Sequence, residues 1–129
     1  MIIAPRFVGL CGTDIQVFRG ARRVLASTLG HEGVGVVAEV GEMVEGWSPG
    51  DSVVFNPVNP SHPDEMLGYT FDSLFQGKIL IPDVRSRNWL IRSIPHDLLS
   101  PVGSLIEIYS HDLVNGSSGD RVAVVIGDG

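Results

Sequence analysis

The chain has 129 residues and a mass of 13.9 kDa, a length that fits one domain and little more. Hydrophobic residues make up 43% and charged residues 19%, which excludes a disordered chain and indicates a domain with a core. The net charge of −6 excludes a bulk attraction for phosphate backbones or anionic lipid, so neither a nucleic acid nor a membrane is expected as a partner. No apolar run approaches the ~20 residues that cross a bilayer, and no signal peptide is recognised. A single cysteine, Cys11, excludes an intramolecular disulfide and favours a cytoplasmic protein.

Short β-branched runs between glycines and prolines predict a mainly β domain. Strands are expected over residues 34–40, 51–55 and 76–82, and the turn pair Pro49-Gly50 precedes the second of them. Residues 56–63 contain three prolines and are predicted to form a loop. The pattern therefore indicates strands joined by tight turns, with helices confined to short segments.

The pattern changes near Ile94. Pro95 is followed by a predicted helix over residues 98–114, and a polar turn follows at 115–120. Residues 121–126 then form an apolar run typical of a strand buried on both faces of a parallel sheet. The chain ends in Gly127-Asp128-Gly129, as a dinucleotide-binding βαβ unit begins, although a strand that simply ends in a turn gives the same residues.

Two short motifs combine metal-binding side chains with glycines. They are GLCGTD at residues 9–14 and LGHEGVG at 29–35, and they contain Cys11, His31 and Glu32. Cysteine and histidine are preferred zinc ligands, and a catalytic zinc keeps three protein ligands and one open position. Taken singly, a buried cysteine and a hydrogen-bonded histidine are the simpler interpretations.

The longer stretches VGLCGTD, LGHEGVGVVAEVG and GDSVV resemble the zinc-dependent medium-chain alcohol and polyol dehydrogenases, within the medium-chain dehydrogenase/reductase group. The resemblance covers residues 7–54 and returns over 94–129. It implies a GroES-like, partly open β-barrel over residues 1–93, with N-terminal strands missing. It also implies that residues 94–129 form a connecting helix and the first strand of a truncated Rossmann domain, which binds NAD or NADP in the family.

The resemblance implies one catalytic zinc site. Cys11 and His31 match the first two ligands, and Glu32 matches a carboxylate that can replace a ligand during exchange. Glu107 matches the third ligand of the polyol branch, although Ile108 replaces the usual proline, and a solvated helix carboxylate is the alternative.

Four further positions take roles from the resemblance. Thr13 matches the hydroxyl that passes the substrate proton towards solvent. Asp14 matches the carboxylate that orients the zinc histidine, with a helix N-cap or turn residue as the alternative. Gly127 and Gly129 match the start of the cofactor-binding loop.

The sequence lacks the four closely spaced cysteines of the family's structural zinc, so none is expected. His62, Asp64 and Glu65 are assigned to a solvated loop instead. Ser73 falls in a region where family members often have glycine.

Other notable side chains are given ordinary roles. His96 and His111 are expected away from the site, and Trp47 and Trp89 are expected to pack. For the basic cluster of residues 19, 22 and 23 a solvated turn is preferred over a place in the substrate pocket.

The function expected is that of an oxidoreductase acting on the CH–OH group of a small alcohol or polyol with NAD(P), as a fragment inactive alone. The alternative is a non-catalytic GroES-like module that binds a partner or self-associates through exposed strand edges. A zinc-free quinone reductase with the same fold is disfavoured, because that branch has no use for Cys11, His31 and Glu107.

Overall fold

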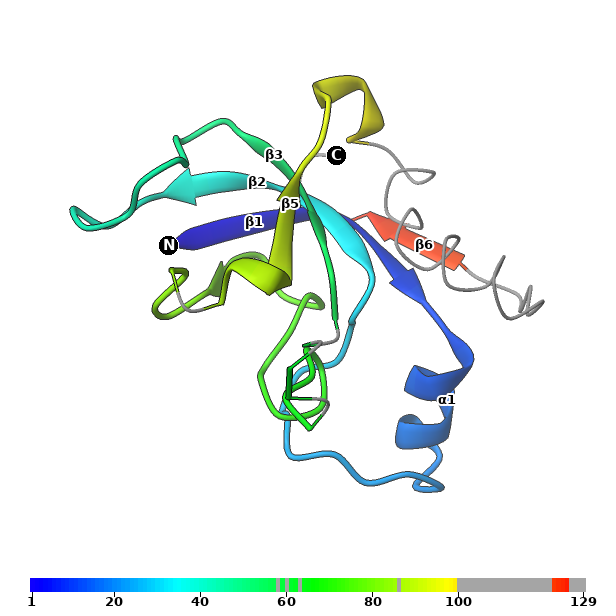
Figure 1. Ribbon diagram of the computed structural model, residues 1–129. Coiled ribbons are helices and arrows are strands. Elements are labelled where there is room, and N and C mark those ends of the chain that lie inside the picture. Colours follow the sequence, from blue (N-terminus) through cyan, green and yellow to red (C-terminus); the bar gives the residue numbers. More distant parts are fainter. Residues whose placement is uncertain (58, 60, 63, 86, 100–121, 126–129) are drawn as a thin grey trace.

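An antiparallel sheet of six strands organises the protein in the computed structural model (Figure 1). The structure describes residues 1–57, 59, 61–62, 64–85, 87–99 and 122–125. Its elements are β1 (Ile2–Leu10), α1 (Gly12–Phe18), β2 (Gly33–Glu39), β3 (Ser52–Phe55), β4 (Ile79–Leu80), the 3-10 turn η1 (Asn88–Leu90), β5 (Ile91–Ser93), the 3-10 turn η2 (His96–Leu98) and β6 (Val122–Val125). The prediction of a mainly β domain with short helices is confirmed.

The strand β1 lies between β4 and β2 in the strand order β4-β1-β2-β3-β5. Both β4 and β6 pair with the edge of β1 opposite β2: β4 pairs with Ile2 and Ile3, and β6 pairs with residues 7–10. No strand was predicted here, because Pro5 and Gly9 interrupt the β-branched pattern. Pro5 lies at a register shift between β1 and β2, where the missing N–H is tolerated. Pairing on two edges therefore overrides the weak local propensity.

The predicted strands over 34–40 and 51–55 are confirmed as β2 and β3, within one residue at each end. The turn before β3 forms as expected, since Gly50 has a φ of +96° that favours glycine. Its N–H donates to the Val37 carbonyl at 2.9 Å, and the Asp51 carboxylate accepts the Ser48 N–H at 2.8 Å. The strand expected over 76–82 is reduced to the two residues of β4.

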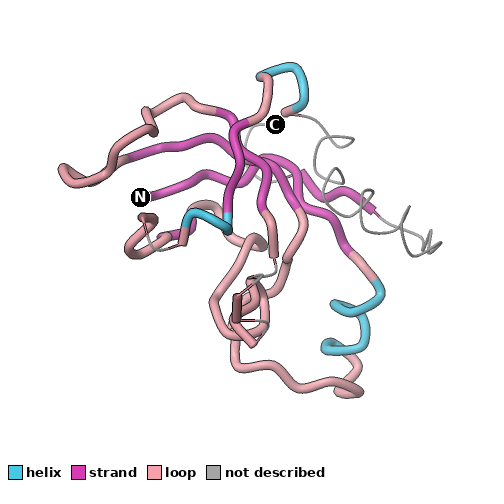
Figure 2. The backbone as a smooth tube through the Cα atoms, viewed as in Figure 1, coloured by secondary structure: helices cyan, strands magenta, loops and turns pink. Residues whose placement is uncertain are grey.

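The core combines side chains of β1, β2 and β3 with aliphatic side chains of the later segments. Figure 2 shows the strands side by side, with most of the remaining described chain as loop. Its members are buried hydrophobic residues: Met1, Ile3, Val8, Val37, Val53, Phe55, Leu67, Leu74, Ile79, Ile81, Val84, Leu90 and Ile91. Trp47 and Trp89 pack against this cluster, which confirms their predicted role.

The C-terminal predictions have mixed outcomes. A strand does form within 121–126, but β6 pairs antiparallel with β1, so the expected parallel pairing is wrong for the described chain. The reason is geometric: β4 covers only the start of β1, and β6 pairs with residues 7–10 on the same edge. The helix predicted over 98–114 lies mostly outside the described residues, which show only η2 at its start. None of the helices described is long and apolar enough to cross a membrane.

Candidate metal centre

The register of β1 and β2 brings the two glycine-rich motifs together. Val8 pairs with Gly33, and the Gly9 N–H donates to the Glu32 carbonyl at 2.8 Å. Cys11 directly follows β1, and Glu32 directly precedes β2. Two residues that are 21 positions apart are therefore fixed at the same end of one antiparallel ladder. A one-residue slip would send these side chains to opposite faces of the sheet.

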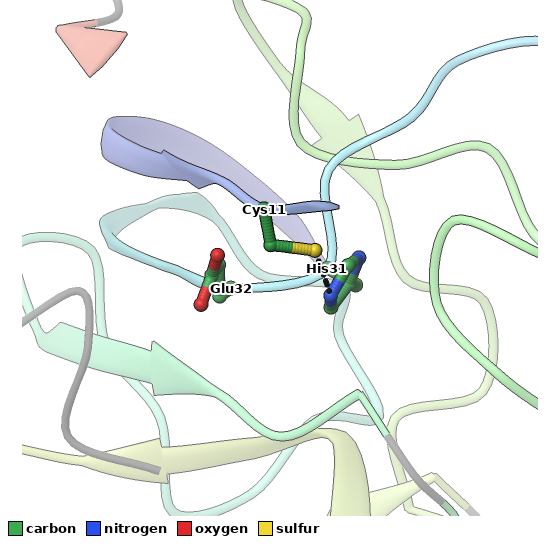
Figure 3. A group of neighbouring side chains, drawn as sticks. All are labelled: Cys11, His31 and Glu32. Atoms are coloured by element: carbon green, nitrogen blue, oxygen red, sulfur yellow. Dashed lines mark hydrogen bonds between the residues drawn. The ribbon is translucent and has the colours of Figure 1, made fainter. Parts of the chain in front are cut away.

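Cys11, His31 and Glu32 converge at this end of the sheet (Figure 3). The Cys11 Sγ lies 3.2 Å from the His31 Nε2, and one ligand atom from each of the three residues lies within 4.8 Å of the others. All three side chains are buried, with Glu32 only 1% exposed. They form the one group of three or more His, Cys, Asp or Glu side chains with ligand geometry in the described part of the chain.

Asp14 connects Cys11 with His31. As the third residue of α1 it accepts the Cys11 backbone N–H on Oδ2 at 3.0 Å, which caps the helix. Its other oxygen, Oδ1, lies 3.7 Å from the His31 Nδ1. The N-cap residue is Cys11, so the alternative of Asp14 as the N-cap is wrong by three positions, and its role towards the zinc histidine stays a prediction.

Burial raises the pKa of the Cys11 thiol above its ordinary value, because a thiolate loses its hydration there. The backbone N–H of Asp14 opposes this shift by hydrogen bonding, whereas the negative charge of the Asp14 carboxylate adds to it. A hydrogen bond with the half-buried Thr13 hydroxyl also favours the thiolate. A cation at the cluster would stabilise the thiolate further.

Gly9 makes the space that Glu32 occupies. A Cβ at position 9 would lie 2.5 Å from the Glu32 Cγ, 2.6 Å from its Cδ and 2.7 Å from its Oε1. The glycine of the first motif is therefore complementary in shape to the carboxylate of the second.

A loop beyond β3 holds the segment that carries His31. The Ser73 hydroxyl and the Leu74 N–H both donate to the Gly30 carbonyl, and the Phe75 N–H donates to the Leu29 carbonyl at 3.0 Å. Gly30 has a φ of +99°, and a Cβ there would lie 3.1 Å from Phe75 and Val8 atoms. Ser73 is fully buried. Ser73, noted only as a departure from the family glycine, thus fixes the backbone next to the candidate ligand His31.

Two more contacts fasten the same loop. The Asp72 Oδ1 accepts the backbone N–H groups of Ser27 and Thr28, and the Thr28 hydroxyl accepts the Ser73 N–H at 2.7 Å. The Tyr69 ring lies edge-on to the His31 ring, with centroids 6.4 Å apart and an interplanar angle of 65°. Sequence reasoning missed Tyr69 and Asp72, since neither lies in a motif and only the fold brings Tyr69 to His31 and Asp72 to Ser27 and Thr28.

The cluster fits a zinc ion. For metal–sulfur and metal–nitrogen bonds of about 2.3 and 2.05 Å, tetrahedral geometry separates the two ligand atoms by about 3.6 Å. The observed 3.2 Å between Cys11 Sγ and His31 Nε2 needs only a small adjustment. Thiolate, imidazole and carboxylate together are a zinc-type ligand set rather than a calcium or magnesium set.

The remaining predicted site residues are placed as follows. Glu107, Gly127 and Gly129 lie outside the described residues, as does His111, so their roles stay predictions. His62 and Asp64 are exposed, and Glu65 accepts a hydrogen bond from Asn59 at 2.9 Å, as expected of a loop. His96 is exposed and interacts with the Ser52 hydroxyl through Nδ1 at 3.0 Å, which agrees with its expected place away from the site.

Comparison with known proteins gives the family. The alcohol dehydrogenase GroES-like domain matches residues 1–82. A 2-dehydro-3-deoxy-L-galactonate 5-dehydrogenase of Pseudoalteromonas atlantica is 30% identical over 141 residues, covering 95% of this chain and 41% of the relative. An (R,R)-butanediol dehydrogenase of Bacillus subtilis is 27% identical over 147 residues, covering 95% of this chain and 42% of the relative.

The fold agrees with this assignment. The crystal structure of galactitol-1-phosphate dehydrogenase from Escherichia coli superposes with a TM-score of 0.69 at 25% identity, covering 87% of this chain and 35% of that one. The chain belongs to the alcohol dehydrogenase GroES-like domain family, in the medium-chain alcohol and polyol dehydrogenase group. It spans about two fifths of the length of these two curated relatives.

Proposed function

We propose that this chain supplies the metal-binding part of a zinc-dependent oxidoreductase that acts on the CH–OH group of a small alcohol or polyol with NAD or NADP. The observation that carries the proposal is the convergence of Cys11, His31 and Glu32 within 4.8 Å in a buried cluster. The relatives are named for the dehydrogenation of a galactonate derivative, butanediol and galactitol-1-phosphate, which supports an alcohol or polyol substrate.

The chain's own residues prepare the site for this chemistry. Cys11 and His31 would hold the metal, with Glu32 beside them and Glu107 as the proposed third ligand. When bound, zinc supplies Lewis acidity towards an alcohol oxygen. Burial of the cluster keeps bulk water away and strengthens every charge interaction there.

Thr13 and Asp14 act on protons and orientation in this proposal. The Thr13 hydroxyl, half-buried beside the Cys11 sulfur, can accept the proton of a substrate hydroxyl and donate its own towards solvent. The Asp14 carboxylate faces the His31 Nδ1, which favours the tautomer that leaves Nε2 free as a ligand. The nicotinamide cofactor accepts the hydride, and Gly127 and Gly129 are the proposed start of its site.

Zinc measurement tests the proposal. Chain purified with zinc should contain one equivalent by atomic absorption, and Cys11→Ser and His31→Ala should lose it. His62→Ala, an exposed histidine of the loop after β3, is the matched control and should keep it. Cobalt in place of zinc should give a thiolate charge-transfer band that Cys11→Ser abolishes. Less than about a tenth of an equivalent in the unsubstituted chain would favour the non-catalytic module.

A second assay concerns turnover. Because the chain spans about two fifths of its relatives' length, the isolated 129 residues are proposed to bind zinc without oxidising alcohols. NAD(P)H formation by the isolated chain would overturn that part of the proposal. The proposal that the chain binds zinc would be unaffected.

A further inference from the structure

Arg22 lies over the face of the tyrosine ring that contacts the candidate metal ligand. Its Cζ is 4.7 Å from the Tyr69 centroid, within the range of a cation–π interaction. The His31 ring centroid is 6.4 Å from the same Tyr69 centroid. Because both separations start from one ring, the guanidinium lies no more than about 11 Å from the His31 ring. A basic cluster expected to be a solvated turn thus contains one member in a defined place.

The loop that carries Arg22 is fastened to the residue under it. The backbone N–H groups of Leu25 and Ala26 both donate to the Tyr69 carbonyl, at 2.9 and 2.8 Å. The side-chain stacking and these two bonds together fix the loop on Tyr69. A cation held in place before a ligand arrives loses less conformational entropy on binding than a free surface arginine.

The stacked guanidinium keeps its hydrogen-bonding groups available. Stacking uses the flat face of the group and leaves its five N–H donors directed outward in its plane. Arg22 is exposed and forms no ion pair with a carboxylate of the described residues. The planar guanidinium, with its forked N–H donors, suits the paired oxygens of a carboxylate or phosphate, which it binds through two parallel hydrogen bonds.

The charges around the site favour one orientation of a ligand that carries such an anion. The chain has a net charge of −6, so its overall field offers no general attraction for anions. At the cluster itself, Asp14 and Glu32 contribute carboxylates. With zinc bound, these carboxylates and the Cys11 thiolate together would offset the ion's double positive charge, so an anionic group is expected at Arg22 and a hydroxyl of the same molecule at the cluster.

The length of a sugar-derived chain falls within this upper limit. With C–C bonds of about 1.5 Å, an extended six-carbon chain with a terminal acid group spans roughly 8–9 Å. We propose that Arg22, stacked on Tyr69, binds an oxyanion at the far end of a polyol substrate, so that the substrates are sugar acids or polyol phosphates. This inference rests on the proposed function, since it places the reacting hydroxyl at Cys11 and His31.

Binding of matched ligands tests this assignment. The zinc-loaded chain is titrated with sorbitol, gluconate and sorbitol 6-phosphate, which share a six-carbon polyol and differ in charge. Calorimetry gives the dissociation constants, and the Arg22 Nε–H resonance reports contact with the anion. Both charged ligands should bind at least about tenfold more tightly than sorbitol, which corresponds to ~1.4 kcal/mol.

Three variants separate a specific contact from general charge. Arg22→Gln should remove the preference for anions, and Arg22→Lys should lose most of it, because a lysine keeps the charge without the planar fork. Arg23→Gln removes one positive charge from the same exposed turn and should keep most of the preference. Equal binding of charged and neutral ligands, or an equal loss in Arg23→Gln and Arg22→Gln, would overturn the assignment.

The two proposals fail differently. If zinc content is absent, the proposed function fails, whatever ligand binds. If zinc is bound and gluconate, sorbitol 6-phosphate and sorbitol bind alike, only the role of Arg22 fails. A preference for one of the two anions over the other would identify the acid group that the fork accepts.

Discussion

Replacing Gly9 with alanine tests whether the fold shapes a place for the Glu32 carboxylate. The added Cβ would lie 2.5 Å from the Glu32 Cγ, a separation that real side chains do not adopt. Glu32 is 1% exposed, so it cannot swing into solvent to relieve the clash. Either the side chain moves within a packed interior or the strand end shifts.

The magnitude follows from two opposing effects. Overpacking of a buried site costs about 1–3 kcal/mol. Glycine to alanine at a compatible backbone position gains about 0.4–1 kcal/mol, because the unfolded chain loses freedom. Gly77→Ala is the control for the second effect, because Gly77 is exposed and its added Cβ would meet nothing within 4 Å. Gly9→Ala should therefore be less stable than Gly77→Ala by about 1–3 kcal/mol.

Urea unfolding of the metal-free chain, followed by circular dichroism, measures these differences. Glu32→Ala in the Gly9→Ala background completes a double-mutant cycle, in which removal of the carboxylate should relieve most of the overpacking. Gly9→Ala should also bind zinc more weakly than Gly77→Ala, since the carboxylate is displaced. Equal stability of the two alanine variants, or additive effects in the cycle, would refute this account of Gly9.

Other predictions concern the Ser73 hydrogen bond, the Cys11 thiol and the metal. Ser73→Ala should lower the free energy of unfolding by about 1 kcal/mol and weaken zinc binding, because the Gly30 carbonyl next to His31 loses a donor. The control Ser93→Ala, at an exposed serine, should change neither quantity in urea and zinc titrations. Because burial raises the pKa of Cys11, the metal-free thiol is protonated at neutral pH and must lose its proton to bind zinc. Apparent zinc affinity should therefore rise with pH, by up to about tenfold per unit for this one proton, and an affinity that does not change with pH would contradict this. Removal of zinc by a chelator should leave the far-ultraviolet dichroism unchanged, because backbone pairing of β1 and β2 fixes the ligand positions; loss of the sheet signal would contradict this.

The strands that could be predicted are those whose sequence is locally consistent. The runs that became β2 and β3 are β-branched and bounded by glycine or a turn, so propensity and pairing agree. In β1, Pro5 and Gly9 oppose a strand locally, and partners on both edges decide the outcome. Such partners lie 25 or more residues away in the chain, beyond what a local pattern contains.

The residues of the site also separate into those that the sequence could indicate and those that it could not. Cys11, His31 and Glu32 could be selected because their residue types are chemically rare in a glycine-rich setting and their motifs resemble a family. Their proximity comes from the β1–β2 register, which no spacing rule states. Tyr69 and Ser73 could not be selected, because a tyrosine and a serine in a loop are common and only their contacts give them a role.

Three glycines of the two motifs have a physical explanation, whereas a Cβ at Gly12 would meet nothing within 4 Å. At Gly9 an added Cβ would meet the Glu32 side chain, at Gly30 it would meet Val8 and Phe75, and at Gly33 it would lie 2.8 Å from the Phe7 carbonyl oxygen. Each of these three glycines lies within two residues of Cys11 or His31. The candidate ligands are thus flanked by backbone segments that pack closely at these three glycines, where the space admits no larger side chain.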